Sequence, residues 1–364
     1  MQRRKFLKTI GVSAAAGVTA PFVTTASAQE TITWNMVTSW PTNFPALGTG
    51  ANDFAERIET LSNGRMRIRV HGAGELVPPL EVFDAVSAGT AEMGHSASYY
   101  WRGKVAASQF FTAVPFGMTT TETNAWLYYG DGQALWDEVY ARHNLKPFAV
   151  GNTGTQMGGW FKKEITSLED MQGLKLRLPG LAGEAMNGIG VTTVNMPGGE
   201  IFTSMQTGVL DAADWVGPYN DLAFGLHQVA KYYYTSVWNE PSAILEGTIN
   251  LDAWNALPDD LKDVVTEAAR ASNLAMISEF AYRNAEALET LVSEHGVELR
   301  TFPEEVMEAL YASSMDVLRK QVEDDEESRK VYASYQAFQQ RVRPFTDVGE
   351  YAYLKARDSV GAGR

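Results

Sequence analysis

The alternation of strand and helix patterns constrains the fold of this chain more than any other feature. Residues 31–37 (TITWNMV) are rich in β-branched and aromatic side chains and predict a strand, followed by a loop over residues 38–50, where prolines and glycines interrupt regular structure. Apolar residues then recur at helical spacing over 54–61 and at strand spacing over 66–70, and residues 82–96 repeat the helix-then-strand order. This order is typical of an α/β domain with a largely parallel sheet.

A second unit of the same kind begins near Lys146. Residues 147–154 (PFAVGNTG) predict a strand that enters a glycine-rich loop, and residues 173–180 (GLKLRLPG) predict a short strand stopped by Pro-Gly. Two further strands are expected within 191–200 and 208–218. Because a chain of 364 residues is too long for one ordinary core, we expect two domains.

The last third of the chain predicts long helices. Residues 259–295 contain no Gly or Pro, and one uninterrupted helix of that length would measure about 55 Å. Such a helix either runs across two lobes or breaks once. Residues 304–343 predict a further helical region that Pro344 ends, with the acidic run 323–328 on a solvated face.

Residues 1–28 have the pattern of a twin-arginine export signal. Arg3 and Arg4 precede an apolar run over residues 10–23 that is too short to span a bilayer, and Ala26 and Ala28 supply the small residues that a signal peptidase needs. We therefore expect cleavage after Ala28 and a mature protein that crosses the membrane already folded and works in the periplasm.

Composition excludes several classes of function. The absence of Cys excludes thiolate metal sites, iron–sulfur clusters and cysteine nucleophiles. The formal charge of −14 becomes about −18 without the four cations of the signal, and such a surface argues against nucleic acid. The motifs of nucleotide sites, zinc hydrolases and serine hydrolases are missing, so we expect no organic cofactor. The histidines lack metal-ligand spacing; His95, at a predicted strand end, is the one candidate base.

Polar residues cluster at the predicted strand ends and glycine-rich loops, where ligands of open α/β sheets bind. They are Asn152, Gln156, Arg177, Asp214, Trp215 and Glu240. Aromatic residues occur in two loops of the first unit, at Trp40, Phe44, Tyr99 and Tyr100. Most aromatic residues of a chain this size pack in cores or hinges, but we expect at least one of these four to cover a ligand.

The stretches GNTGTQMGGWF, GLKLRLPG through NMPGGEIF, GVLDAADWVGPYNDL and KYYYTSVWNEP carry a family resemblance. The chain resembles the extracytoplasmic solute receptors of TRAP (tripartite ATP-independent periplasmic) transporters, in particular those that bind 2-oxo monocarboxylates such as pyruvate, or lactate. The resemblance implies a two-lobed periplasmic-binding-protein fold with mixed sheets, a hinge and long C-terminal helices. It places lobe I at 29–148 plus about 239–275, lobe II at 149–238 plus about 276–310, and a C-terminal helical region at about 311–364.

The resemblance also implies roles for single residues. Arg177 would grip the ligand carboxylate, for which a guanidinium offers two parallel N–H donors; the alternative is a surface ion pair. The side chains of Gln156, Asp214 and Glu240 and the main-chain carbonyl of Trp215 would bind Na⁺ or Ca²⁺, which prefer oxygen ligands. The alternative for the two acids is capping a helix or facing water. Close relatives usually have Glu in place of Asp214, and the shorter side chain affects the distance to a metal or its identity.

Other expectations leave two alternatives open. Asn152 either donates to the ligand or fixes its own loop. The stretch from 304 to 343 either exchanges between the two subunits of a homodimer, as in related receptors, or folds back on its own lobe.

The resemblance implies a binding protein without catalytic activity that delivers a small carboxylate to membrane permease subunits. The alternatives are a ferric-binding receptor that uses tyrosinates, and a periplasmic enzyme acting on small acids, for which His95 would need a carboxylate partner.

Overall fold

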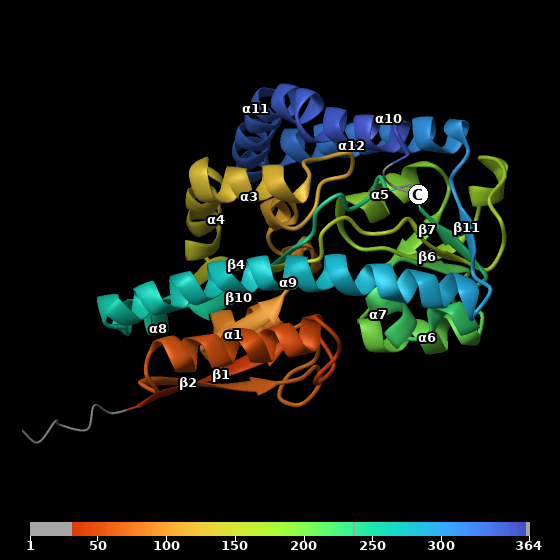
Figure 1. Cartoon of the computed structure of the whole chain (residues 1–364). Coiled ribbons are helices and arrows are strands. Elements are labelled where there is room, and N and C mark those ends of the chain that lie inside the picture. The colour runs from red at the N-terminus through yellow and green to blue at the C-terminus, as the bar shows by residue number, and fades with distance from the viewer. Residues whose placement is uncertain (1–30, 236, 362–364) are drawn as a thin grey trace, which may run out of the picture. The chain divides into compact units, whose positions relative to one another are not determined.

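The structure, a computed structural model, describes residues 31–361 except residue 236. The predicted export signal and its cleavage site lie outside these residues. Within them, no helix is long and apolar enough to cross a membrane. The described chain contains two sheets with helices packed around them (Figure 1).

The first sheet has five strands in the order β2-β1-β3-β10-β4. They are β1 (Ile32–Thr38), β2 (Met66–His71), β3 (Met93–Ser96), β4 (Leu145–Asn152) and β10 (Ile244–Asn250). Strand β1 pairs in parallel with β2 and β3, as the alternation predicts, whereas β10 is antiparallel to both of its neighbours. The sheet is therefore mixed.

Several helices surround the first sheet. They are α1 (Leu47–Leu61), α2 (Val82–Ser87), α3 (Thr120–Tyr129), α4 (Gly132–Ala141) and α8 (Leu251–Ala256), with the short 3-10 helices η1 (Ser98–Trp101) and η2 (Ala106–Phe111). Helix α1 corrects the expected loop over 38–50, because it begins at Leu47 and includes Gly48. A Cβ at Gly48 would lie 2.5 Å from the carbonyl oxygen of Pro41, so this glycine permits a close backbone contact rather than a turn.

The second sheet has six strands in the order β11-β9-β5-β8-β6-β7. They are β5 (Gly159–Phe161), β6 (Lys175–Arg177), β7 (Thr192–Val194), β8 (Ala212–Ala213), β9 (Tyr232–Tyr234) and β11 (Glu298–Arg300). Strand β6 is parallel to β7 and β8, and β5 is antiparallel to β8 and β9. Around it lie α5 (Gly180–Gly188), α6 (Gly198–Gln206), α7 (Pro218–Ala223), η3 (Glu169–Met171) and η4 (Leu226–Gln228).

Helix α9 (Asp259–Ser293) connects the two sheets without a break over 35 residues. It packs against α1 and β4 at the first sheet and against α7 at the second, and Figure 1 shows it lying alongside both. Leu261 and Val265 join the core around β1 and β10, whereas Met276 and Phe280 join a core with residues of the second sheet. Of the two expected forms, the helix takes the one that runs across both halves. The lobe boundaries stay a prediction.

The C-terminal region corrects one expectation about helix ends. It forms α10 (Glu304–Asp324), α11 (Glu326–Val348) and α12 (Glu350–Ser359). The break comes at Asp325, whose side chain accepts a bond from the backbone N–H of Ser328 (2.7 Å) and caps α11. Pro344 lies inside α11 rather than at its end. The proline is tolerated because Gln340, whose carbonyl loses its helical partner, is exposed to water.

A buried acid lies in the core of the first sheet. Glu246 on β10 accepts hydrogen bonds from the indole of Trp101 and the hydroxyl of Tyr140, both 2.8 Å long. Burial raises the pKa of this carboxyl from 4.5 to about 8, and the two hydrogen bonds offset the increase only in part. Glu246 therefore folds into the core as a neutral acid at pH 7.

We predict that Glu246 makes the protein less stable as pH rises. Between its unfolded pKa and its higher folded pKa, the folded state holds a proton that the unfolded state has released, so each pH unit in this window lowers the free energy of unfolding by about 1.4 kcal/mol. Glu246→Gln should remove this slope, as measured by urea unfolding of both proteins from pH 5 to pH 9. Parallel curves for the two proteins would contradict the prediction.

Candidate ligand and cation site

Arg177 occupies the end of β6, where Pro179 and Gly180 stop the strand and α5 begins. Its side chain is completely buried (0% exposed). Nη1 donates to the carbonyl of Asp214 (2.9 Å), Nη2 to the hydroxyl of Tyr100 (3.2 Å) and Nε to the carbonyl of Met196 (3.3 Å). This burial excludes the alternative of a surface ion pair.

The guanidinium of Arg177 retains two free donors. Of its five N–H groups, three are used, which leaves one N–H on Nη1 and one on Nη2. A guanidinium binds a carboxylate through both oxygens when it offers one N–H from each of two nitrogens. No described carboxylate forms a direct ion pair with Arg177, although its charge acts on the nearby acids Asp214 and Glu240.

Four buried side-chain oxygens beside this arginine have no hydrogen-bond partner in the described protein. They are Oε1 of Gln156, Oδ2 of Asp214, Oδ1 of Asn239 and Oε2 of Glu240. Hydrogen bonds tie these residues together: the backbone N–H of Gln156 donates to the carbonyl of Glu240 (3.2 Å), and Nδ2 of Asn239 donates to Oδ1 of Asp214 (3.1 Å). Buried polar atoms normally have partners, so four such oxygens in one place point to a bound cation.

The electrostatics of the two acids fit the same interpretation. Burial raises the pKa of Asp214 to about 7, although the Arg177 charge opposes the increase. Burial and the neighbouring Asp214 charge raise the pKa of Glu240 well above its usual range. Two buried acids that repel each other are stabilised by positive charge, and hard cations bind such oxygens. Among the described residues, no group of three or more His, Cys, Asp and Glu side chains could hold a metal ion. This cluster contains two acids, and its other unpartnered oxygens belong to the amides of Gln156 and Asn239.

The loop over 152–156 holds Asn152 and Gln156 in different hydrogen-bonding arrangements. Asn152 donates from Nδ2 to the hydroxyl of Ser242 (2.9 Å) and accepts the backbone N–H of Gly154 (2.7 Å), which is the loop-fixing arrangement. Gln156 donates from Nε2 to the hydroxyl of Thr153 (3.1 Å) and keeps its oxygen free. The amide oxygen of Gln156 is therefore free to bind a cation, whereas both the nitrogen and the oxygen of the Asn152 amide have protein partners.

Three of the four predicted aromatic residues contact Trp215 or Arg177, and Tyr99 contacts one of the three, Tyr100. The ring of Trp215 lies 6.2 Å from Trp40 and 6.3 Å from Phe44, and the guanidinium of Arg177 lies over it at 5.1 Å. Tyr99 and Tyr100 contact each other edge to face at 4.9 Å. Segments of the first sheet thus contact strand ends of the second where Arg177, the last residue of β6, bonds to Tyr100 of η1 and to Asp214, which follows β8.

His95 does not pair with a carboxylate. Its Nδ1 accepts the indole N–H of Trp40 (2.8 Å), and burial lowers its pKa to about 3, so the ring stays neutral. The Trp40 bond fixes the tautomer with hydrogen on Nε2. His95 therefore orients Trp40, an aromatic residue of the site. Its contacts with the described residues do not include the carboxylate partner that the enzyme alternative needs.

Sequence reasoning missed Asn239. Its neighbour Glu240 was selected from the stretch VWNEP, but an amide has no charge or spacing pattern that marks it as functional. Only the fold shows that its side chain contacts Asp214, 25 positions earlier in the chain.

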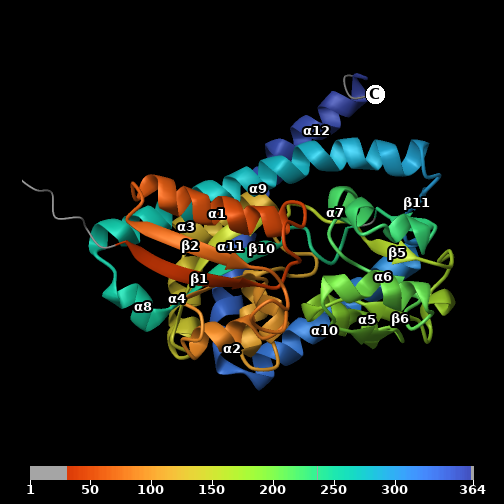
Figure 2. The same ribbon diagram turned by 90° about the horizontal axis from the view of Figure 1, so that it is seen from below.

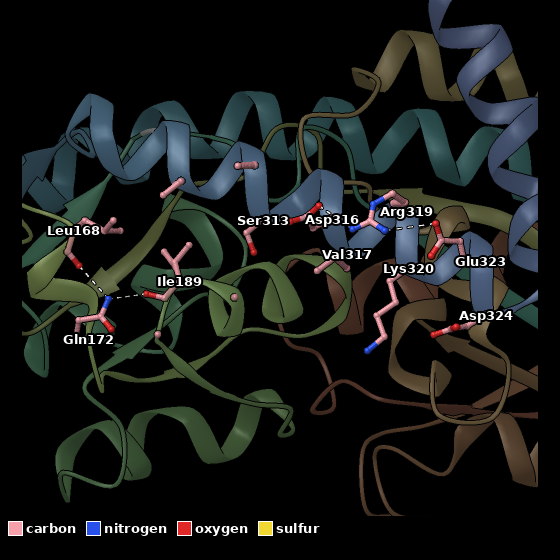
Figure 3. A pocket seen from close by; sticks show the side chains of 14 residues that line it. Leu168, Gln172, Ile189, Ser313, Asp316, Val317, Arg319, Lys320, Glu323 and Asp324 are labelled. Atoms are coloured by element: carbon pink, nitrogen blue, oxygen red, sulfur yellow. Dashed lines mark hydrogen bonds and ion pairs between the residues drawn. The ribbon is translucent and has the colours of Figure 1, made fainter.

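Figure 3 shows a groove of about 950 Å³. It is formed by α10 residues such as Ser313 and Lys320 together with Gln172 and Ile189. None of the predicted site residues lines it. The groove is therefore distinct from the Arg177 cluster.

Comparisons with known proteins agree with the architecture. A family model described as bacterial extracellular solute-binding protein, family 7 (DctP), matches residues 36–325. Over 360 residues the chain is 41% identical to the monocarboxylate 2-oxoacid-binding periplasmic protein of Nostoc sp., covering 97% of this chain and 98% of that protein.

Two solved structures are similar over nearly the whole chain. A TRAP periplasmic solute-binding protein from Pseudoalteromonas atlantica with bound sodium and pyruvate is 40% identical, covers 90% of this chain and 99% of its own, and has a TM-score of 0.87. A TRAP transporter solute-binding protein from Bordetella bronchiseptica, a mixed-occupancy dimer with calcium and picolinate, is 34% identical, covers 92% and 99%, and has a TM-score of 0.89. The family resemblance and the fold class are thereby confirmed, and the chain belongs to the DctP family of bacterial extracellular solute-binding proteins.

Proposed function

We propose that this protein is the extracytoplasmic receptor of a TRAP transporter, and that it binds a small 2-oxo or 2-hydroxy monocarboxylate together with Na⁺ or Ca²⁺. The observation that carries the proposal is the buried guanidinium of Arg177, which has two free N–H groups beside buried oxygens that lack partners. An anionic ligand and a cation together satisfy both sets of atoms. The relatives that bind a 2-oxo acid, or pyruvate with sodium, support this choice of ligand.

Each side chain then has a defined task in binding. The two free N–H groups of Arg177 hold the ligand carboxylate, and the Tyr100 and Asp214 contacts fix the plane of the fork. Gln156, Asp214 and Glu240, with the carbonyl of Trp215, hold the cation. The cation supplies positive charge that offsets the two acids and attracts the remaining ligand oxygens.

Closure around the ligand follows from where these residues originate. Trp40, Phe44 and Tyr100 come from loops of the first sheet, whereas Arg177 and Trp215 follow strands of the second. A ligand that contacts both sets stabilises the closed arrangement relative to an open one. Receptor function requires this change, because the permease must distinguish loaded from empty receptor.

The alternatives are less well supported. The hydroxyl of Tyr100 is occupied by Arg177, which does not favour a ferric tyrosinate site, and His95 is occupied by Trp40. We propose that the protein has no catalytic activity, that the twin-arginine signal exports it to the periplasm, and that it delivers its ligand to the TRAP permease subunits.

A ligand panel tests the proposal. The mature protein is unfolded and refolded to remove bound ligand, and its melting temperature is measured with pyruvate, 2-oxobutyrate, lactate or succinate, each with Ca²⁺ and with Na⁺. A ligand at one hundred times its Kd stabilises the folded state by about 2.7 kcal/mol. We expect a large upward shift with at least one monocarboxylate and little with succinate. No shift with any of them would contradict the proposal.

We further propose a homodimer that forms through α12. Helices α10 and α11 pack on the chain's own core through Leu318, Val331 and Tyr335, which favours the alternative that they fold back. Figure 2 shows α12 projecting from the rest of the described chain. None of its residues is buried, and its apolar side chains Tyr351, Tyr353 and Leu354 are exposed. The dimer of the Bordetella relative supports a homodimer.

Charged residues on α12 should prevent this dimer. We predict that Tyr351→Asp combined with Leu354→Asp gives a monomer in light scattering coupled to gel filtration. Wild type and a control on another helix, Lys320→Asp, whose lysine is exposed on α10, should elute as dimers. Burial of the introduced carboxylates in an apolar interface would be unfavourable. A double variant that remains dimeric would place the interface elsewhere.

A further inference from the structure

Asn239 is held in one orientation by two hydrogen bonds. It is almost completely buried (2% exposed), and its Nδ2 donates to Oδ1 of Asp214 (3.1 Å) and to the carbonyl of Met157 (3.4 Å). Both acceptors require the nitrogen on that side, which assigns the amide unambiguously. The carbonyl oxygen, Oδ1, therefore has a fixed direction and no partner in the described protein.

The surroundings of this oxygen are what distinguish it. Asn273 on α9 has the same bonding pattern, with Nδ2 donating to Asn124 (2.9 Å) and Tyr128 (2.8 Å) and with Oδ1 unpartnered. The acceptors of Asn273 are neutral side chains. Asn239 instead bonds to the carboxylate of Asp214 and precedes Glu240 in the chain, and each of these acids also leaves one oxygen without a partner in the described protein. An unpartnered amide oxygen in that position can serve as a ligand of a cation.

We propose that Asn239 is a further ligand of the cation, binding through Oδ1 while its amide nitrogen orients the Asp214 carboxylate. This inference rests on the proposed function. A neutral amide oxygen suits the position because Asp214 and Glu240 already repel each other. Another carboxylate there would increase that repulsion, whereas an amide adds a ligand oxygen without adding charge.

The bond to Asp214 gives Asn239 a second effect. Oδ1 of Asp214 is occupied by the Asn239 amide, which leaves Oδ2 as the oxygen for the ion. A partner that fixes a metal-binding carboxylate commonly changes metal affinity 10- to 100-fold. Affinity alone therefore cannot separate a direct ligand from a positioning residue, and the test needs to count ligands.

Terbium luminescence provides that count. Tb³⁺ takes oxygen ligands as Ca²⁺ does and is excited through nearby indoles such as Trp215, and its lifetimes in H₂O and D₂O give the number of bound waters. With saturating pyruvate, we expect Asn239→Ala to bind Tb³⁺ at least 10-fold more weakly and with one more water than wild type. Asn239→Asp, which keeps an oxygen, should show the wild-type number of waters.

Controls separate the outcomes. Asn273→Ala should leave both affinity and water number unchanged, and Asn239→Ser, which is too short to reach the ion, replaces the alanine variant if that does not fold. An unchanged water number in the Ala or Ser variant would overturn the inference, even with weaker binding. If wild-type protein bound neither pyruvate nor a cation, the proposed function itself would fail. That result differs from failure of the Asn239 inference, in which wild type binds both and the variant keeps the wild-type number of waters.

Discussion

Arg177→Lys is expected to weaken binding of the carboxylate ligand by roughly 10- to 100-fold while the fold persists. Lysine keeps the positive charge beside Asp214 and Glu240 but loses the two parallel N–H groups of the fork. It also cannot reproduce the bonds to Asp214, Met196 and Tyr100 together. Calorimetric titration of pyruvate into both proteins, at saturating cation, measures the loss.

Lysine is the more informative substitution at this position. Alanine would also leave two buried acids without a neighbouring positive charge, so loss of stability would complicate the comparison. The matched control is Arg67→Lys, because Arg67 is an exposed arginine of β2 that pairs with Glu59 (2.9 Å). That control should bind as wild type. Near-wild-type affinity in Arg177→Lys would show that the guanidinium does not hold the ligand.

Glu240→Gln is expected to weaken cation binding at least 10-fold and to weaken ligand binding in parallel when cation is limiting. The substitution keeps the shape of the side chain and removes one of two negative charges at the proposed site. Excess Ca²⁺ should restore much of the ligand affinity. Titrations of pyruvate at several Ca²⁺ concentrations measure this linkage.

Glu246→Gln is the matched control for Glu240→Gln. Both acids are almost completely buried, but both oxygens of Glu246 have protein partners whereas Oε2 of Glu240 has none. The control should retain wild-type dependence on Ca²⁺. Equal behaviour of the two variants would remove Glu240 from the proposed cation site.

The sequence predicts those parts of the fold that depend on local pattern. Strand β6 and the direction change after it follow from GLKLRLPG, and the 35-residue α9 follows from a long segment without Gly or Pro. The start of α1 and the passage of α11 through Pro344 were missed, because a close backbone contact and solvent exposure decided them. Tertiary packing overrode the local propensity at the start of α1, whereas at Pro344 the helix continues because the carbonyl without a helical partner belongs to an exposed residue.

The residues of the candidate site also divide into those that the sequence predicts and those that only the structure reveals. Arg177, Asp214 and Glu240 could be selected because charges at strand ends are conspicuous, and the family resemblance indicated their roles. Asn239 could not be selected, because its meaning depends on a contact between distant segments. For the same reason, only the structure shows that Trp40 is held by His95 and meets Trp215 from the other sheet.

The central claim is that one small carboxylate and one cation bind together at the Arg177 cluster. Calorimetry of refolded mature protein tests it directly: pyruvate is titrated in sodium-free buffer with chelator, and again after Ca²⁺ or Na⁺ is restored. We predict one-to-one binding that requires a cation. Binding of equal strength with and without any cation, or no binding of any small monocarboxylate, would contradict the account.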